Sequence, residues 1–91
     1  MTLSQALDRL AAAQTLVNEA RFVAESNEND APELLTEVDV AAEFLSIADS
    51  FVDSFRRVPN PAFLVSACIH LKECESRAQA ILDRFAAPCV A

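Results

Sequence analysis

One stretch of the sequence, Leu34 to Val58, constrains the fold more than any other. Its apolar residues recur at alternating spacings of four and three, at Leu34, Val38, Ala41, Leu45, Ala48, Val52 and Phe55. This spacing is typical of a helix with one continuous apolar seam. A second apolar seam runs beside the first, at Val40, Phe44, Ile47, Phe51 and Val58. Because a helix with two adjacent apolar seams packs against two neighbours, we expect this helix to lie at the middle of a bundle.

The predicted central helix covers about residues 31–57, and two further helices are predicted over about 3–25 and 61–87. The first helix has a seam in which alanine predominates, and small side chains let a neighbouring helix approach closely. We therefore expect that seam to pack against the phenylalanine-rich flank of the central helix. The third helix has its own seam, at Leu64, Ala67, Leu71, Cys74, Ala78, Ile81 and Phe85.

Capping residues mark where these helices begin. Two residue pairs have the spacing of a capping box: Thr2 with Gln5, and Asp30 with Glu33. In a capping box each side chain of the pair accepts a hydrogen bond from a backbone N–H group that the helix leaves free. Asn60 is a favourable N-cap residue, and Pro61 suits the first helical position.

The chain contains no glycine, which disfavours tight hairpins and excludes glycine-rich phosphate loops. Its hydrophobic residues make up 53% of the total, too many for a disordered chain. Short polar connections favour antiparallel neighbours. We therefore predict a single all-α domain over residues 1–91, an antiparallel three-helix bundle with a frayed tail at 88–91. The alternatives are completion by dimerisation, or a hairpin of the last two helices with the first helix exchanged between subunits.

The charge of the chain limits its partners and its location. A net charge of −7 disfavours direct contact with nucleic-acid phosphates or with anionic membranes. No apolar run reaches the roughly 18–20 residues of a membrane span, and the first residues lack the basic and apolar regions of a secretory signal. Three cysteines, an odd number, fit a reducing compartment. We expect a cytoplasmic protein with no direct nucleic-acid or membrane partner.

The reactive residues of the third helix do not predict a catalytic or metal site. His70 and Cys74 are four residues apart, but a structural zinc site needs four ligands, which only a dimer would supply. The simpler interpretation makes Cys74 a small core residue and His70 a boundary residue. Paired carboxylates such as Asp49 with Asp53 lie on a polar helix face, where solvation keeps them ionised. We therefore predict no enzyme, no metal and no cofactor.

A few apolar residues fall outside the continuous seams and are candidate anchors for a partner. Val65, Cys68 and Ile69 lie on a separate side of the third helix, where three helices alone would leave them partly exposed. The competing interpretation packs them beneath the first helix or the first loop. Phe22 falls on the polar side of the first helix, and it either folds over the following loop or anchors a partner.

An acidic stripe follows the polar face of the central helix, at Asp39, Glu43, Asp49 and Asp53. We expect these carboxylates to steer a basic partner protein. An alternative function is mimicry of nucleic-acid phosphates by an inhibitor, and the simplest interpretation is a solvated helix face.

In its short, acidic, alanine-rich and glycine-free character, the chain resembles small bacterial and phage regulators. That class includes anti-activators, antitoxins, secretion chaperones and anti-CRISPR proteins. The likeness implies a helical regulator but assigns no site residues. The predicted function is a non-enzymatic protein-binding regulator, acting as an inhibitor, anti-activator or adaptor through one helix face, with a homodimer also expected. A homodimeric structural protein with a minor cysteine–histidine metal site is a further alternative.

Overall fold

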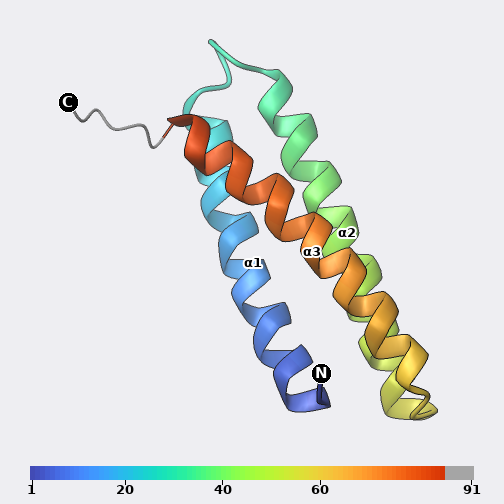
Figure 1. Ribbon diagram of the computed structural model, residues 1–91. Coiled ribbons are helices and arrows are strands. Elements are labelled where there is room, and N and C mark those ends of the chain that lie inside the picture. Colours follow the sequence, from blue (N-terminus) through green and yellow to red (C-terminus); the bar gives the residue numbers. More distant parts are fainter. Residues whose placement is uncertain (86–91) are drawn as a thin grey trace.

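A computed structural model describes residues 1–85 as three α-helices: α1 (Leu3–Ser26), α2 (Glu33–Arg57) and α3 (Pro61–Phe85). In Figure 1 the chain rises through α1, descends through α2 and rises again through α3. Each helix contacts the other two, and the interface between α2 and α3 is the most extensive. The predicted all-α three-helix bundle is therefore confirmed. The predicted helix end at residue 87 and the predicted tail at 88–91 lie outside the described residues.

The capping residues of α1 and α3 act as predicted. Gln5 donates its backbone N–H to Thr2 Oγ1 over 3.1 Å, and Thr2 donates its own N–H to Gln5 Oε1 over 2.8 Å. At the start of α3, Asn60 Oδ1 accepts a hydrogen bond from the Ala62 N–H over 3.0 Å. These bonds satisfy backbone donors that the first turn of a helix leaves free, and they fix where each helix begins.

The predicted capping box at the start of α2 is wrong. Pro32 occupies the N-cap position, no side chain caps this end, and the helix begins at Glu33 rather than at residue 31. The reason lies in the preceding turn, where the Ala31 N–H bonds to the Asn27 carbonyl over 2.8 Å. That turn places Ala31 in the core with only 4% of its surface exposed, so Asp30 lies too early in the chain to cap the helix.

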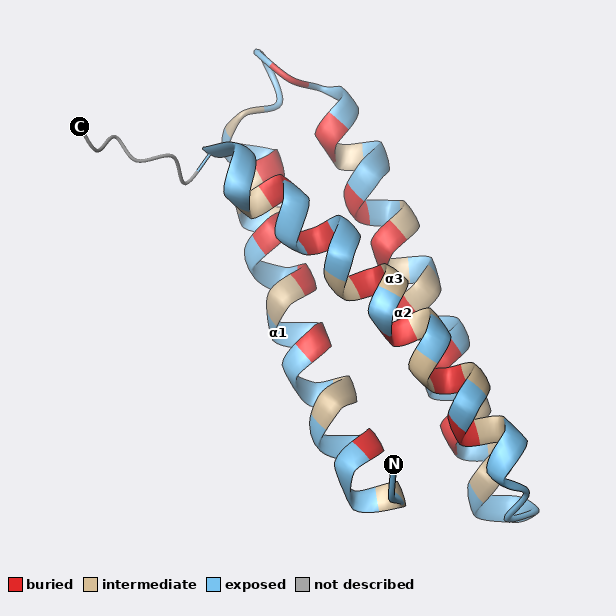
Figure 2. Ribbon diagram, viewed as in Figure 1, coloured by how far each residue is buried: buried red, intermediate tan, exposed pale blue. Residues whose placement is uncertain are grey.

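The core lies along the common axis of the three helices, where buried positions follow the predicted seams (Figure 2). Its fully buried side chains of largest volume come from α2 and α3: Leu34, Leu71, Ile81, Val38, Val52 and Cys74. From α1 come smaller residues, mainly Ala6, Ala13, Val17, Ala20 and Ala24. No described polar side chain is buried, and no described helix is long and apolar enough to cross a membrane.

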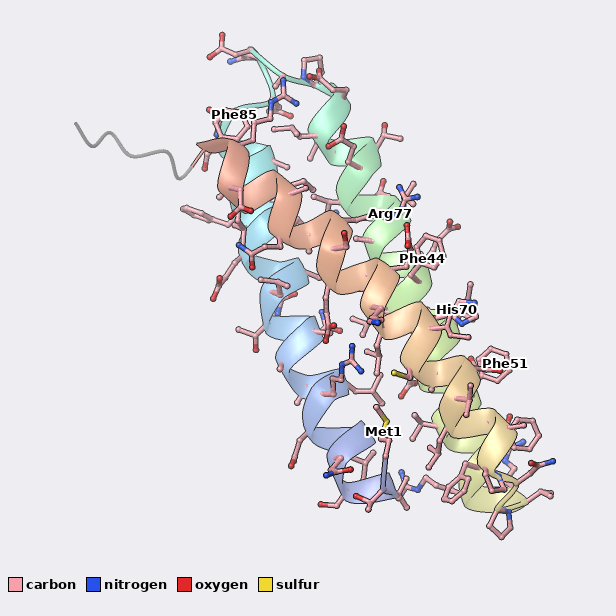
Figure 3. All side chains as sticks on the ribbon, in the orientation of Figure 1. Met1, Phe44, Phe51, His70, Arg77 and Phe85 are labelled. Atoms are coloured by element: carbon pink, nitrogen blue, oxygen red, sulfur yellow. The ribbon has the colours of Figure 1, made fainter. Side chains whose placement is uncertain are left out.

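The phenylalanine-rich flank of α2 packs beside α3, which corrects the expectation that it would meet the alanine seam of α1. The Phe51 ring centroid lies 5.4 Å from that of His70 and 6.5 Å from that of Phe63. The Phe44 ring lies 6.0 Å from His70, and Figure 3 shows this row along the edge between α2 and α3. The first seam of α2 supplies the buried residues of this helix, whereas Phe44 and Phe51 of the second seam are half-buried at the edge of the core.

The buried seam of α3 should dominate the stability of the bundle. We expect Leu71→Ala to lower the free energy of unfolding by about 2–5 kcal/mol, because Leu71 is fully buried and its truncation leaves a cavity. The matched control is Ile69→Ala, an exposed aliphatic residue on the same helix, which should cost less than about 1 kcal/mol. Urea denaturation followed by circular dichroism measures both values. Equal losses in the two variants would contradict the assigned register of α3.

Candidate functional site

The start of α3 directs a pair of aliphatic side chains outward. Because the helix begins at Pro61 and turns its Leu64, Ala67 and Leu71 seam into the core, positions 65 and 69 face away from it. Val65 is 60% exposed and Ile69 61% exposed. These two residues do not pack beneath α1 or the first loop. They form the exposed apolar surface that the sequence predicts for a bundle of three helices.

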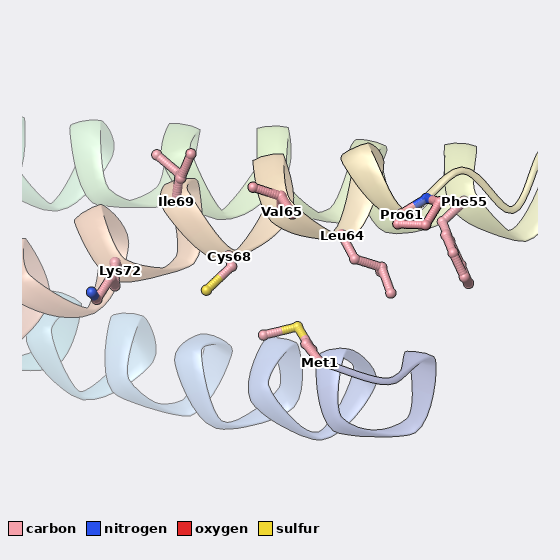
Figure 4. A pocket seen from close by; sticks show the side chains of 8 residues that line it. All are labelled: Met1, Phe55, Pro61, Leu64, Val65, Cys68, Ile69 and Lys72. Carbon is pink, nitrogen blue, oxygen red and sulfur yellow. The ribbon is translucent and has the colours of Figure 1, made fainter.

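A groove of about 480 Å³ adjoins this surface (Figure 4). Its lining comes from all three helical regions: Met1 before α1, Phe55 near the end of α2, and Pro61, Leu64, Val65, Cys68, Ile69 and Lys72 of α3. Figure 4 shows the Met1 side chain reaching from the α1 side toward α3. A thioether is flexible and polarisable, so Met1 suits a wall that adapts to a bound apolar group.

Cys68 lines the groove and also contacts a half-buried ion pair that joins α1 to α3. The Arg9 guanidinium bonds Glu75 twice, from Nη2 to Oε1 over 2.7 Å and from Nε to Oε2 over 2.9 Å. A third guanidinium N–H donates to Cys68 Sγ over 3.1 Å. Hydrogen bonding to the Glu75 carboxylate raises the pKa of Arg9 above its already high ordinary value, so this cation stays charged. The half-buried pair fixes the spacing of α1 and α3 beside the groove.

Lys72 is the unpaired cation of the groove. Five of the seven basic residues form ion pairs, all of them arginines: Arg9, Arg21, Arg57, Arg77 and Arg84. Lys72 makes no ion pair or hydrogen bond with any of residues 1–85, although it lines an otherwise apolar groove. Its ammonium group is therefore available to an anionic group on whatever binds there.

Phe22 is exposed but belongs to a different part of the surface. It is 71% exposed, so the following loop does not cover it. Arg9 lies level with Cys68, and Phe22 follows Arg9 by thirteen residues, or about 20 Å along α1. The structure thus brings Val65, Cys68 and Ile69 together and leaves Phe22 apart from them.

The acidic stripe of α2 is exposed and partly paired. Asp39 bonds Arg21 of α1 at 3.2 Å, and Asp53 bonds Arg57 at 2.8 Å. Glu43 and Asp49 form no ion pair within the described residues. Exposed pairs add little stability, but they lower the net negative charge that the stripe presents. This pairing favours an ordinary polar face over an imitation of regularly spaced phosphates.

The structure separates His70 from Cys74. Cys74 is fully buried in the core, whereas His70 lies half-buried between the rings of Phe44 and Phe51. His70 Nδ1 lies 2.7 Å from the Ser66 carbonyl oxygen, which fits a protonated Nδ1 acting as the donor. Within residues 1–85 no three metal-ligating side chains of the histidine, cysteine or carboxylate type come together.

Several groove residues escaped the sequence analysis. Leu64 belongs to the buried seam and Met1 precedes the first helix, so no local pattern joins them to the groove. The ion pair beside the groove joins Arg9 to Glu75, sixty-six residues away. The sequence did contain a signal for Lys72, in its spacing from the exposed aliphatic pair. Lys72 follows Ile69 by three residues and Val65 by seven, which places all three on one side of a helix.

Comparison of the chain with known protein families, characterised proteins and solved structures finds no match. The geometry of the site is therefore what bears on function. The relevant features are an exposed aliphatic pair, an adjoining apolar groove and a free ammonium group on the same helix.

The cysteines of α3 should differ in reactivity. Burial raises the pKa of the Cys74 thiol, with a smaller contribution from the Glu75 carboxylate, so little thiolate forms there at pH 8. In a Cys89→Ser chain, we expect iodoacetamide to label Cys68 in the native state and Cys74 only after unfolding. Peptide mapping by mass spectrometry gives the two rates. Native labelling of Cys74 as fast as in urea would contradict its placement in the core.

The same pKa shift predicts how stability depends on pH. A thiol whose pKa is raised by folding contributes stability below its unfolded pKa and loses that contribution as pH rises through the folded pKa. The loss should therefore fall in the alkaline range and disappear in Cys74→Ala. Urea midpoints at neutral and alkaline pH measure it, and an equal alkaline loss in both chains would contradict the assignment.

Proposed function

We propose that the protein is a non-enzymatic, protein-binding regulator that docks the outer face of α3 on another protein, as an inhibitor, anti-activator or adaptor. The observation that carries this proposal is the pair Val65 and Ile69, about 60% exposed beside an apolar groove. Full burial of an aliphatic side chain of this size contributes roughly 1.5–3 kcal/mol. Two such residues, four apart on one helix, are typical anchors for helix docking.

The lining of the groove favours binding over catalysis. Six of its eight residues have apolar side chains: Met1, Phe55, Pro61, Leu64, Val65 and Ile69. A catalytic site needs convergent polar groups, one of them able to move a proton near neutral pH. His70 lies on the α2 side of α3, and Arg9 is held by Glu75. We also propose that the protein works in the cytoplasm, since Cys68 and Cys74 are both free thiols.

An aspartate at position 69 tests the docking face. We expect Ile69→Asp to weaken the complex with the partner at least tenfold, because the change removes an aliphatic anchor and binding would then bury a charged carboxylate. The chain should stay folded, since Ile69 is exposed. Tagged wild-type and variant chains are recovered from cells that express the protein, and native mass spectrometry gives the amount and composition of each complex.

The control is Thr36→Asp, which adds the same charge at an exposed position of α2 away from the groove and from the outer face of α3. It should leave the complex unchanged. Phe22→Ala decides whether the end of α1 also contacts the partner. The proposal fails if Ile69→Asp recovers the same complex in the same amount as wild type, or if wild type is recovered as a homodimer alone.

A further inference from the structure

A second hollow continues the groove along the bundle. It has a volume of about 650 Å³ and is lined by Ala12, Ala13 and Leu16 of α1 and by Lys72, Glu75, Ser76 and Gln79 of α3. Lys72 lines both hollows, and the Arg9–Glu75 ion pair bridges the two helices between them. We call the two hollows together the α1–α3 furrow. It follows α3 from Pro61 to Gln79, a rise of eighteen residue steps or about 27 Å, which is five helical turns.

The α1 wall of the furrow is apolar beyond what the core requires. Ala12 is exposed and Leu16 is half-buried, in addition to the buried Ala13 beside them. An amphipathic helix with a single packed face normally has polar residues at its other positions. Small side chains such as Ala12 allow the close approach of another helix. Ala12 and Leu16 therefore offer apolar surface to one further helix beside α3.

The unpaired charge of Lys72 indicates what kind of protein segment would occupy the furrow. Lys72 lies near the middle of the furrow and has no anionic partner within residues 1–85. An occupant that covers it without a carboxylate would bury an unpaired ammonium, which is costly. A second copy seated symmetrically, furrow on furrow, would bring two Lys72 residues together near the centre and would join two chains of net charge −7. A different protein with a carboxylate at that point avoids both costs.

We infer that the α1–α3 furrow receives an amphipathic helix of about eighteen residues from the partner protein, with a carboxylate that pairs with Lys72. This inference rests on the proposed function and specifies the chemistry of the partner segment. The incoming helix completes a four-helix bundle. Its apolar stripe covers Val65, Ile69 and Leu16, and its carboxylate sets the register along the furrow.

Two synthetic peptides test the charge. Each is an eighteen-residue amphipathic helix with leucine at alternating spacings of three and four and alanine or glutamine elsewhere, and the ninth residue, beside the leucine stripe, is Glu in one and Lys in the other. We expect the Glu peptide to bind the wild-type chain about tenfold more tightly than the Lys peptide. Lys72→Glu should reverse this preference, while Thr36→Glu, which adds a carboxylate to α2 away from the furrow, should keep it. Fluorescence anisotropy of labelled peptides gives the dissociation constants.

Cys68 reports where the peptide binds. In the Cys89→Ser chain, a saturating amount of the Glu peptide should slow iodoacetamide labelling of Cys68 at least about fivefold, because the thiol lies in the furrow. The inference is overturned if neither peptide binds, if Lys72→Glu leaves the preference unchanged, or if bound peptide does not protect Cys68. It is also overturned if the chain without peptide is a homodimer that already protects Cys68. Recovery of the partner complex in the Ile69→Asp experiment is independent of these results, so failure of the furrow assignment is distinguishable from failure of the proposed function.

Discussion

Small residues at the facing positions of α2 and α3 let these two helices pack closely, and the rest of the bundle depends on that contact. Ala41 and Ala48 of α2 and Ala67, Cys74 and Ala78 of α3 are all fully buried. Their small side chains bring the two backbones near each other, and Leu34, Leu71 and Ile81 fill the remaining space. Because this seam fixes the rotation of α3 about its own axis, it also fixes which residues of α3 face outward.

The position of α1 follows from a weaker constraint. Its buried residues are mostly alanines, so each contributes little apolar area to the core. The half-buried pair of Arg9 with Glu75, and the exposed pair of Arg21 with Asp39, tie α1 to α3 and α2 respectively. A helix held by small side chains and polar contacts leaves more of its apolar surface uncovered than one held by leucine and phenylalanine. The hollows between α1 and α3 result from this incomplete coverage of apolar surface.

The sequence predicted the seams well because the periodicity of a helix determines which side chains share a face. It predicted the capping of α1 by Thr2 and Gln5 from local pattern alone, but it left open whether Val65 and Ile69 would be exposed or packed beneath α1. The prediction failed where the packing depends on which neighbouring helix or turn a given helix face contacts. The phenylalanines of α2 pack beside α3 instead of α1, and the turn that buries Ala31 moved the start of α2. The furrow could not be predicted, because residues sixty-six positions apart, Arg9 and Glu75, determine its geometry.

In the proposed complex, Lys72 would allow the furrow to select its occupant. An apolar surface alone binds many amphipathic helices with similar free energy, since the hydrophobic effect is non-directional. An ammonium group in the middle of that surface is solvated while the furrow is open and loses water when a helix covers it. A helix that supplies a carboxylate recovers the lost interaction, whereas one that supplies only apolar residues leaves the charge unpaired. Such an arrangement adds little affinity for a helix with the carboxylate, but it greatly lowers the affinity for helices without one. A small interface can obtain specificity in this way. The other basic residues of the described bundle, except Arg56, are already paired with carboxylates of the chain itself. Lys72 is the one that remains unpaired within the furrow, where a partner's carboxylate would meet it.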